Sequence, residues 1–110
     1  MRGKPPLEST ITRAIIRALR SVPGLVVRKR HGSALGYAGE PDLYGCFRGR
    51  HFEIEVKRPG RKLTPLQQQR LKEWALAGAI VGVAHSVEEA IELIGVRAVG
   101  KRDSQKCVRL

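Results

Sequence analysis

The sequence contains only two cysteines and no long apolar run. Cys46 and Cys107 lie far apart and match neither a zinc-binding pattern nor a disulfide framework, so we expect free thiols in a reducing compartment. No apolar stretch approaches the roughly 18 residues that cross a membrane. The first residues are not followed by the apolar region of a secretory signal either. These absences predict a soluble, intracellular, cytoplasmic protein with no membrane partner.

Acidic residues are scarce in this chain. It has 10 aspartates and glutamates against 21 lysines and arginines, which gives a net charge of +11 at pH 7. Such a surface attracts phosphate backbones and releases counterions when they bind, so salt should weaken the association. A basic surface can also serve a membrane, but no helix in the sequence has a large dedicated cationic face. We therefore expect a polyanionic partner.

The chain has the length of one domain, because 110 residues can bury a single modest core. Its composition changes clearly only after Gly95, where residues 96–110 carry five basic residues and one acid. We expect residues 1–95 to form the domain and residues 96–110 to form a basic C-terminal extension.

Hydrophobic periodicity predicts three helices and four strands. The predicted helices are 7–22, 64–78 and 86–95, and the predicted strands are 25–27, 41–47, 51–57 and 79–84. Capping boxes at Thr64 to Gln67 and Ser86 to Glu89 mark two helix starts. The nearly continuous apolar strand 79–84 is expected to be covered on both faces. The order αβββαβα predicts an α/β fold with a mixed central sheet flanked by helices.

The predicted hairpin between 41–47 and 51–57 brings two acids together. Alternation along the second strand places Glu55 and Lys57 on one face. If Arg48-Gly49 forms a two-residue turn, Asp42 lies directly opposite Glu55, whereas a three-residue turn shifts the pairing by one. Adjacent carboxylates repel unless one holds a proton or a cation lies between them, so the pair predicts a divalent-metal site.

The acids are also clustered along the chain. Glu40, Asp42, Glu53 and Glu55 are four of the ten acids and fall within 16 residues, which is where a metal site would need them. The alternative is a salt-bridged, solvent-facing hairpin. Glu8 lies on the apolar stripe of the first helix and is a further candidate, although an acid at a helix N-terminus can simply interact with the helix dipole.

These residues resemble the PD-(D/E)XK nuclease superfamily, and within it the VRR-NUC (virus-type replication-repair nuclease) group. The resemblance covers about residues 7 to 95. It rests on Glu8 followed by the segments 39–43 (GEPDL), 52–57 (FEIEVK), 63–67 (LTPLQ) and 78–89, in that order. It implies a restriction-endonuclease-like αβββαβ(α) fold in a single domain.

The resemblance also implies an active site. Asp42 and Glu55 would coordinate Mg²⁺ or Mn²⁺ together with the Val56 carbonyl, and Glu8 would act directly or through water. Lys57 would position or activate the attacking water. The family places a glutamine beside the site, which implies a role there for Gln67, but Gln67 also completes a capping box that needs no catalysis.

Several basic or aromatic residues are candidate contacts to nucleic acid. They are Arg30 and Tyr37 in the glycine-rich loop, and Arg58, Arg61 and Lys62 after the predicted catalytic lysine. Each of these loops is also compatible with simple solvation. His31 and His85 have no partner at metal-binding spacing, and we interpret His51 as structural.

The combined expectation is a metal-dependent DNA endonuclease, selective for branched or Holliday-junction-like DNA. The resemblance implies a homodimer with a role in DNA replication or repair, and a phage-encoded origin is compatible with it. Two alternatives stay open: a non-catalytic DNA-binding module in which the acids are structural, and an RNA-directed nuclease.

Overall fold

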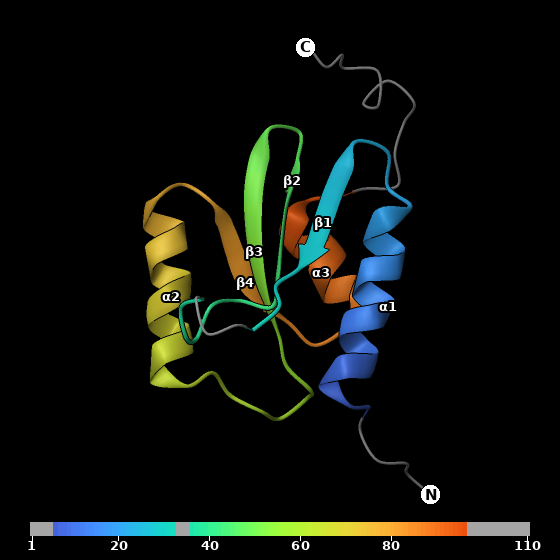
Figure 1. Cartoon of the computed structure of the whole chain (residues 1–110). Coiled ribbons are helices and arrows are strands. Elements are labelled where there is room, and N and C mark those ends of the chain that lie inside the picture. Colours follow the sequence, from blue (N-terminus) through green and yellow to red (C-terminus); the bar gives the residue numbers. More distant parts are fainter. Residues whose placement is uncertain (1–5, 33–35, 97–110) are drawn as a thin grey trace, which may run out of the picture.

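A four-stranded mixed sheet forms the centre of the computed structural model, which describes residues 6–32 and 36–96 (Figure 1). The strands are β1 (Leu25–Lys29), β2 (Leu43–Phe47), β3 (Arg50–Val56) and β4 (Ile80–Ala84), and they lie in that order across the sheet. The first three are antiparallel, while β4 runs parallel to β3. The predicted order αβββαβα and the mixed sheet are therefore confirmed.

Three helices cover the sheet unequally. The helices α1 (Glu8–Arg20) and α3 (Val87–Ile94) contact each other, and α2 (Pro65–Leu76) lies apart from them beside β4 (Figure 1). The hydrophobic core lies between the sheet and the α1–α3 pair; it contains Phe52, Ile54 and Val56 of β3. The other face of β3 carries Glu53 and Glu55, so this strand builds the core on one side and presents acids on the other.

The hairpin between β2 and β3 has the two-residue turn considered from the sequence. Phe47 pairs with Arg50, and the two turn residues have positive φ angles, 55° for Arg48 and 79° for Gly49, as a type I′ turn requires. The β2–β3 register pairs Leu43 with Ile54, so one further step places Asp42 opposite Glu55, as predicted for a two-residue turn. The negative charge of Asp42 acts directly on Glu55, which agrees with this proximity.

Some boundaries differ from the sequence prediction. β1 extends to Lys29 instead of Val27, because backbone pairing with β2 continues through Arg28 and Lys29, whose side chains are exposed on this edge strand. β2 begins at Leu43 and not at Pro41, whose nitrogen carries no hydrogen to donate. α1 begins one residue and ends two residues inside the predicted range.

The last strand is packed against by helices, as expected. Both α2 and α3 contact β4, which forms an edge of the sheet, and only Ala84 is fully buried while Ile80 to Val83 are half-buried. The apolar run therefore reflects helix packing around an edge strand. At the following helix start, Ser86 accepts from the Glu89 amide, but the Glu89 carboxylate accepts from the His85 amide, so this capping box is incomplete.

The predicted basic extension, residues 96–110, lies outside the described residues except for Val96, and so does Cys107. Cys46 is an exposed free thiol. Within the described part of the chain, no helix is long and apolar enough to cross a membrane.

Gly45 in β2 provides a test of the packing between β1 and β3. A methyl group at Gly45 would collide with the Val26 carbonyl oxygen and would lie 2.6 Å from the Phe52 ring. We expect Gly45→Ala to lower the free energy of unfolding by about 2 kcal/mol, measured by urea denaturation. Gly32→Ala is the control, because open space surrounds Gly32. Equal stability of Gly45→Ala and wild type would contradict this packing.

Candidate active site

The predicted catalytic residues meet where β3 ends. Glu55 belongs to β3, Lys57 follows its last residue, and Asp42 directly precedes β2. The N-terminal ends of α1 and α2 lie at the same end of the sheet (Figure 1), and they contribute Glu8 and Gln67. Five residues from four parts of the chain thus reach one region.

Glu55 is the most constrained of these residues, since its side chain is only 4% exposed. Its Oε2 accepts a hydrogen bond from Gln67 Nε2 at 3.1 Å and lies 3.9 Å from Lys57 Nζ. Its Oε1 is buried and has no hydrogen-bond partner among the described residues. A buried carboxylate oxygen without a donor is costly unless a cation or a proton satisfies it.

The surroundings of Glu55 favour its neutral form when no cation is present. Burial raises the pKa of Glu55 to about 8, and the negative charge of Asp42 adds to the effect. Lys57 lowers the pKa but does not outweigh these causes, and Glu8 raises it further. The charges of Asp42 and Glu8 thus act on Glu55 at close range. A divalent cation would favour the ionised form instead.

Asp42 is half-buried and is fixed by the end of β3. Its Oδ2 accepts a hydrogen bond from the Val56 amide at 2.9 Å. Val56, the last residue of β3, is itself buried. This bond holds the Asp42 carboxylate against the strand that carries Glu55, so the two acids face each other at the end of the β2–β3 ladder.

The remaining predicted site residues occupy the periphery of this pair. The Lys57 side chain is 12% exposed, which leaves its ammonium close to Glu55 and partly accessible. Glu8 is half-buried, and its Oε2 accepts a 3.5 Å hydrogen bond from the Arg58 amide. Gln67 combines both roles considered above: its Oε1 accepts from the Thr64 amide to complete the capping box, while its Nε2 donates to Glu55.

The four clustered acids divide into two groups. Asp42 and Glu55 lie in the site, but Glu53 forms an ion pair with Arg30 and Glu40 accepts from Trp74 Nε1 at 2.8 Å. The expectation that all four surround a metal is therefore wrong for Glu40 and Glu53. The solvent-facing alternative is also wrong, because Glu53 and Glu55 are both buried.

The contacts of Glu53 and Glu40 with Arg30, His51 and Trp74 form a second polar network, which was not predicted from the sequence. His51, interpreted as structural, contacts Glu53 Oε2 through Nε2 at 2.6 Å and stacks on Trp74. Alternation along β3 places Glu53 on the same face as Glu55. A second acid on that face would need a positively charged partner, and this could have been inferred from the sequence. The position of Arg30 beside Glu53 depends on the β1–β2 register, which the sequence analysis left open.

No group of three or more histidine, cysteine, aspartate or glutamate side chains is arranged as a ready metal cage within residues 6–32 and 36–96. A cation between Asp42 and Glu55 would therefore need further oxygen ligands from the backbone, water or a bound phosphate. Mg²⁺ characteristically binds in this way, with one or two carboxylates, several waters and substrate oxygens.

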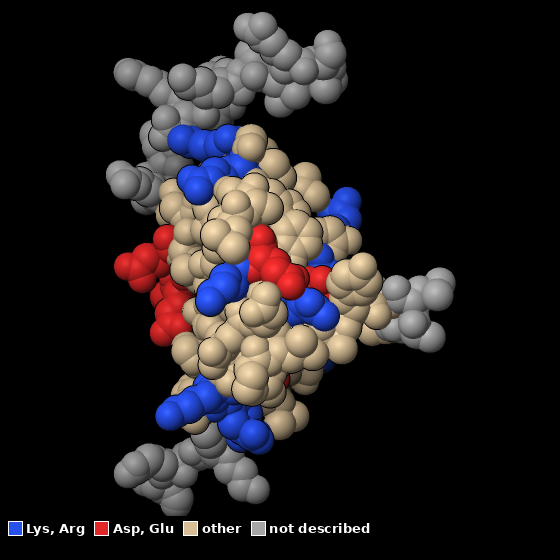
Figure 2. Space-filling view, turned by 90° about the vertical axis from the view of Figure 1, so that its left-hand side faces the viewer, with Lys and Arg blue, Asp and Glu red and all other residues tan. Residues whose placement is uncertain are grey.

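The candidate nucleic-acid contacts differ in accessibility. Arg61 and Lys62 are exposed and Arg58 is half-buried, all in the loop between β3 and α2. This loop lies at the lower end of Figure 1, and Figure 2 shows basic side chains at that end, with others at the upper end and beside acids in the middle. Tyr37 is 73% exposed and lies under the Arg70 guanidinium. Arg30 is instead engaged by Glu53 within the fold.

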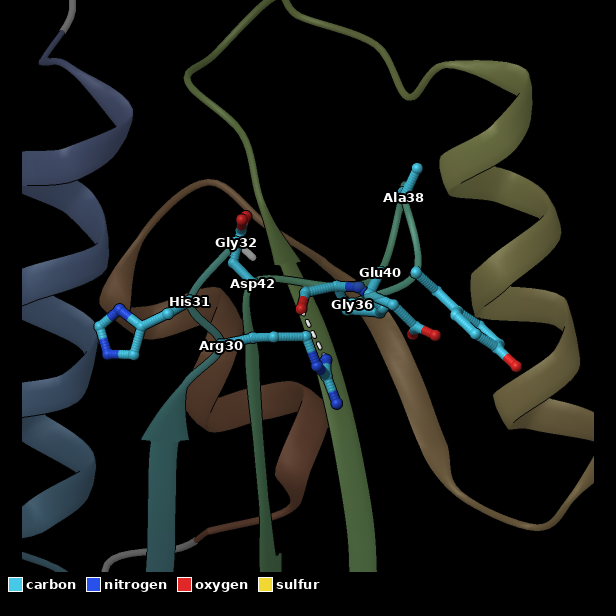
Figure 3. Close-up of a pocket in the computed structure, with 10 residues that line it drawn as sticks. Arg30, His31, Gly32, Gly36, Ala38, Glu40 and Asp42 are labelled. Carbon is cyan, nitrogen blue, oxygen red and sulfur yellow. Dashed lines mark hydrogen bonds between the residues drawn. The ribbon is translucent and has the colours of Figure 1, made fainter. Parts of the chain in front are cut away.

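A cavity of about 520 Å³ adjoins the site (Figure 3). It is lined by Arg30, His31 and Gly32 on one side and by residues 36–42 on the other. Its volume is in the range of ligand-binding clefts, and Asp42 lies on its wall. Of the clustered acids, Glu40 and Asp42 thus border an open space of the size of a ligand-binding cleft.

Comparison with solved structures identifies the fold. One structure described as "VRR_NUC domain" matches with a TM-score of 0.66 and 28% sequence identity, covering 81% of this chain and 95% of that chain. Another, "VRR_NUC domain protein", has a TM-score of 0.66 and 20% identity over 84% of this chain and 88% of its own. No protein-family model matches the chain, and no curated protein matches it significantly. The chain therefore has the VRR-NUC fold, and the resemblance inferred from its motifs is confirmed.

The buried Glu55 should make stability depend on pH when no metal is present. Between pH 4.5, where the unfolded carboxyl ionises, and about 8, the folded protein holds a proton that the unfolded chain has lost. The free energy of unfolding contributed by Glu55 therefore falls as pH rises through this window. We expect Glu55→Gln to be more stable than wild type at pH 8 in EDTA by about 3 kcal/mol, measured by urea denaturation.

The difference between the two proteins should disappear below pH 4.5, where Glu55 is neutral in both states. Adding Mn²⁺ at pH 8 should raise the unfolding midpoint of wild type and change that of Glu55→Gln much less. Equal stability at pH 8, with equal responses to Mn²⁺, would show that Glu55 is not a strained buried acid.

Proposed function

We propose that this chain is a divalent-metal-dependent endonuclease that hydrolyses phosphodiester bonds in DNA. The observation that carries the proposal is the convergence of Asp42, buried Glu55 and Lys57 at the end of β3, where one Glu55 oxygen has no hydrogen-bond donor among the described residues. The VRR-NUC fold supports it, because this fold belongs to the PD-(D/E)XK nucleases. The basic surface of the chain suits a polyphosphate substrate.

The donor set fits Mg²⁺ or Mn²⁺. Hard divalent cations prefer oxygen ligands, and Asp42 and Glu55 provide carboxylates whose mutual repulsion such an ion would relieve. The Val56 carbonyl would be a further ligand, and Glu8 would contribute directly or through water. When bound, the ion lowers the pKa of a coordinated water and neutralises negative charge on the scissile phosphate.

Lys57 and Gln67 would support the Asp42–Glu55 pair in two different ways. The partly accessible Lys57 ammonium would stabilise negative charge on the attacking oxygen and on the phosphate as the bond forms. Gln67 would hold the Glu55 carboxylate in one orientation by donating to Oε2. While the first turn of α2 is formed, the capping bond from the Thr64 amide to Gln67 Oε1 restricts the orientation of that donor.

The substrate we propose is branched DNA, and the process it serves is replication or repair. The exposed cations Arg61 and Lys62, together with Arg58, would contact phosphates next to the scissile bond. Tyr37 would contact the substrate from the other side, at the cavity beside Asp42. An RNA substrate would satisfy the same charges, so the nucleic acid itself has to be tested.

We further propose that the protein acts as a homodimer, as the family resemblance implies. Two copies would present two sites to two strands of a branched substrate. The edge strand β4 offers half-buried apolar residues, and Leu76 of the neighbouring helix α2 is 82% exposed. Apolar edges of this kind are commonly covered by a second chain.

Removal of either key charge should stop catalysis without stopping binding. We expect Asp42→Ala and Lys57→Ala each to lower the cleavage rate in Mg²⁺ at least 100-fold, because metal coordination and charge stabilisation are lost. Their DNA affinity in EDTA should stay salt-sensitive and within about threefold of wild type. Lys72→Ala, an exposed lysine on α2, is the control and should cleave normally. Undiminished cleavage by purified Lys57→Ala would refute the mechanism.

Substrate class can be determined in one experiment with the wild-type protein. Linear duplex, flap, splayed arm, four-way junction, single-stranded DNA and matched RNA are incubated in Mg²⁺ and in EDTA. We expect products only in Mg²⁺, with the four-way junction or another branched DNA cut fastest. Binding without product in Mg²⁺ would favour a non-catalytic DNA-binding module. Preferential cleavage of RNA would identify RNA, and not DNA, as the substrate.

A further inference from the structure

The ion pair between Arg30 and Glu53 lies directly beside the proposed active site. Glu53 is fully buried and is two residues before Glu55 on the same face of β3. Arg30 donates to both of its oxygens, NH1 to Oε1 at 2.8 Å and NH2 to Oε2 at 3.2 Å. This bidentate geometry fixes the plane of the guanidinium as well as its distance from the carboxylate.

Arg30 also holds the segment that carries Asp42. Its NH1 donates to the Pro41 carbonyl at 2.7 Å, and its backbone amide donates to the Asp42 carbonyl at 2.8 Å. Figure 3 shows the Arg30 side chain beneath this segment, joined to it by a dashed line. Glu40, one residue earlier, accepts from Trp74 of α2. Three consecutive residues before β2 are therefore tied to Arg30 or Trp74.

Aromatic rings enclose the guanidinium. It lies 4.6 Å from the centre of the Tyr44 ring and 5.8 Å from that of Trp74. On the far side of Glu53, His51 contacts Oε2 and stacks on Trp74 with ring centres 5.0 Å apart. The Arg30 side chain is only 25% exposed. A planar, stacked guanidinium in this enclosure cannot be replaced by the point charge of a lysine without loss of orientation.

Stability alone does not account for this pair. Burying two opposite charges costs desolvation energy that their attraction often only balances, so a buried ion pair is a weak source of folding free energy. Asp42, by contrast, needs external support, because it lies in a bend outside β2 and follows a loop. A catalytic carboxylate has to be held within about 0.5 Å of its productive position.

We infer that Arg30 and Glu53 are positioning residues, which fix the segment 40–42 and thereby hold the Asp42 carboxylate against the end of β3. This inference rests on the proposed function of Asp42. Neither residue touches the reacting atoms; Arg30 acts through the backbone of Pro41 and Asp42, and Glu53 acts by orienting Arg30. The role differs from the phosphate contact predicted for Arg30 from the sequence.

The test uses the double variant Arg30→Met, Glu53→Gln. It removes both charges together, keeps similar side-chain volumes and leaves the net charge unchanged, so folding and salt-dependent DNA binding should be preserved. The first readout needs no metal: it is hydrogen exchange of the Val56 amide, which donates to Asp42 Oδ2. The others are Mn²⁺ affinity by calorimetry, DNA affinity in EDTA, and kcat and KM for cleavage.

We expect the Val56 amide to exchange at least tenfold faster in the double variant, and Mn²⁺ to bind about tenfold more weakly. The kcat should fall at least tenfold, with KM and DNA affinity in EDTA within about twofold of wild type. Arg30→Lys keeps the charge beside Glu53 and should give intermediate exchange and kcat. It supplies the same readouts if the double variant does not fold.

Wild-type exchange at Val56 together with wild-type kcat in these variants would overturn the inference. So would weaker DNA binding in EDTA and a raised KM with unchanged exchange, because that outcome assigns Arg30 to phosphate. Failure of the proposed function has a different signature: wild type itself would then neither bind Mn²⁺ nor cleave. The Val56 exchange would still report whether Arg30 and Glu53 hold Asp42.

Discussion

The arrangement of this protein depends on one unfavourable contact, the approach of Asp42 to the buried carboxylate of Glu55. Burial and like charge together push Glu55 toward its neutral form. Two neighbouring groups partly stabilise the Glu55 carboxylate. Gln67 of α2 donates a hydrogen bond to it, and the Lys57 ammonium after β3 lies close to it. One oxygen of Glu55 is still without a donor in the described part of the chain. A divalent cation bound between the two carboxylates would relieve this repulsion.

β3 shows how one strand can serve stability and chemistry together. Phe52, Ile54 and Val56 pack against α1 and α3, while Glu53 and Glu55 face the opposite side with α2. Because both faces of the strand are buried, its acids experience a low dielectric that a surface hairpin would not provide. The two acids then have different partners. Glu53 is neutralised by Arg30 within the fold, whereas Glu55 has Lys57 at 3.9 Å from one oxygen and no donor to the other among the described residues.

Much of the architecture was predictable because it depends on local patterns. Alternation along 51–57 predicts that Asp42 faces Glu55 if Arg48-Gly49 is a two-residue turn, and the hairpin has that turn. The division of the four acids was not predictable, because proximity in sequence does not show which of them meets a cation from another strand. Arg30 reaches Glu53 only through the pairing of β1 with β2, and Trp74 reaches Glu40 only through the packing of α2. The edge position of β4 was likewise not predictable, since its apolar composition indicates helix contacts and does not indicate its neighbours in the sheet.

Gln67 connects the secondary structure to the chemistry in a further way. The same side chain closes the first turn of α2 and donates to Glu55, so the start of a helix and the orientation of the Glu55 carboxylate share one amide. Helix ends are the parts of a fold that open most readily. Transient fraying of this turn would release Glu55 while the sheet stayed intact. The protein would then lose its competent state through a local fluctuation that leaves its global melting temperature untouched.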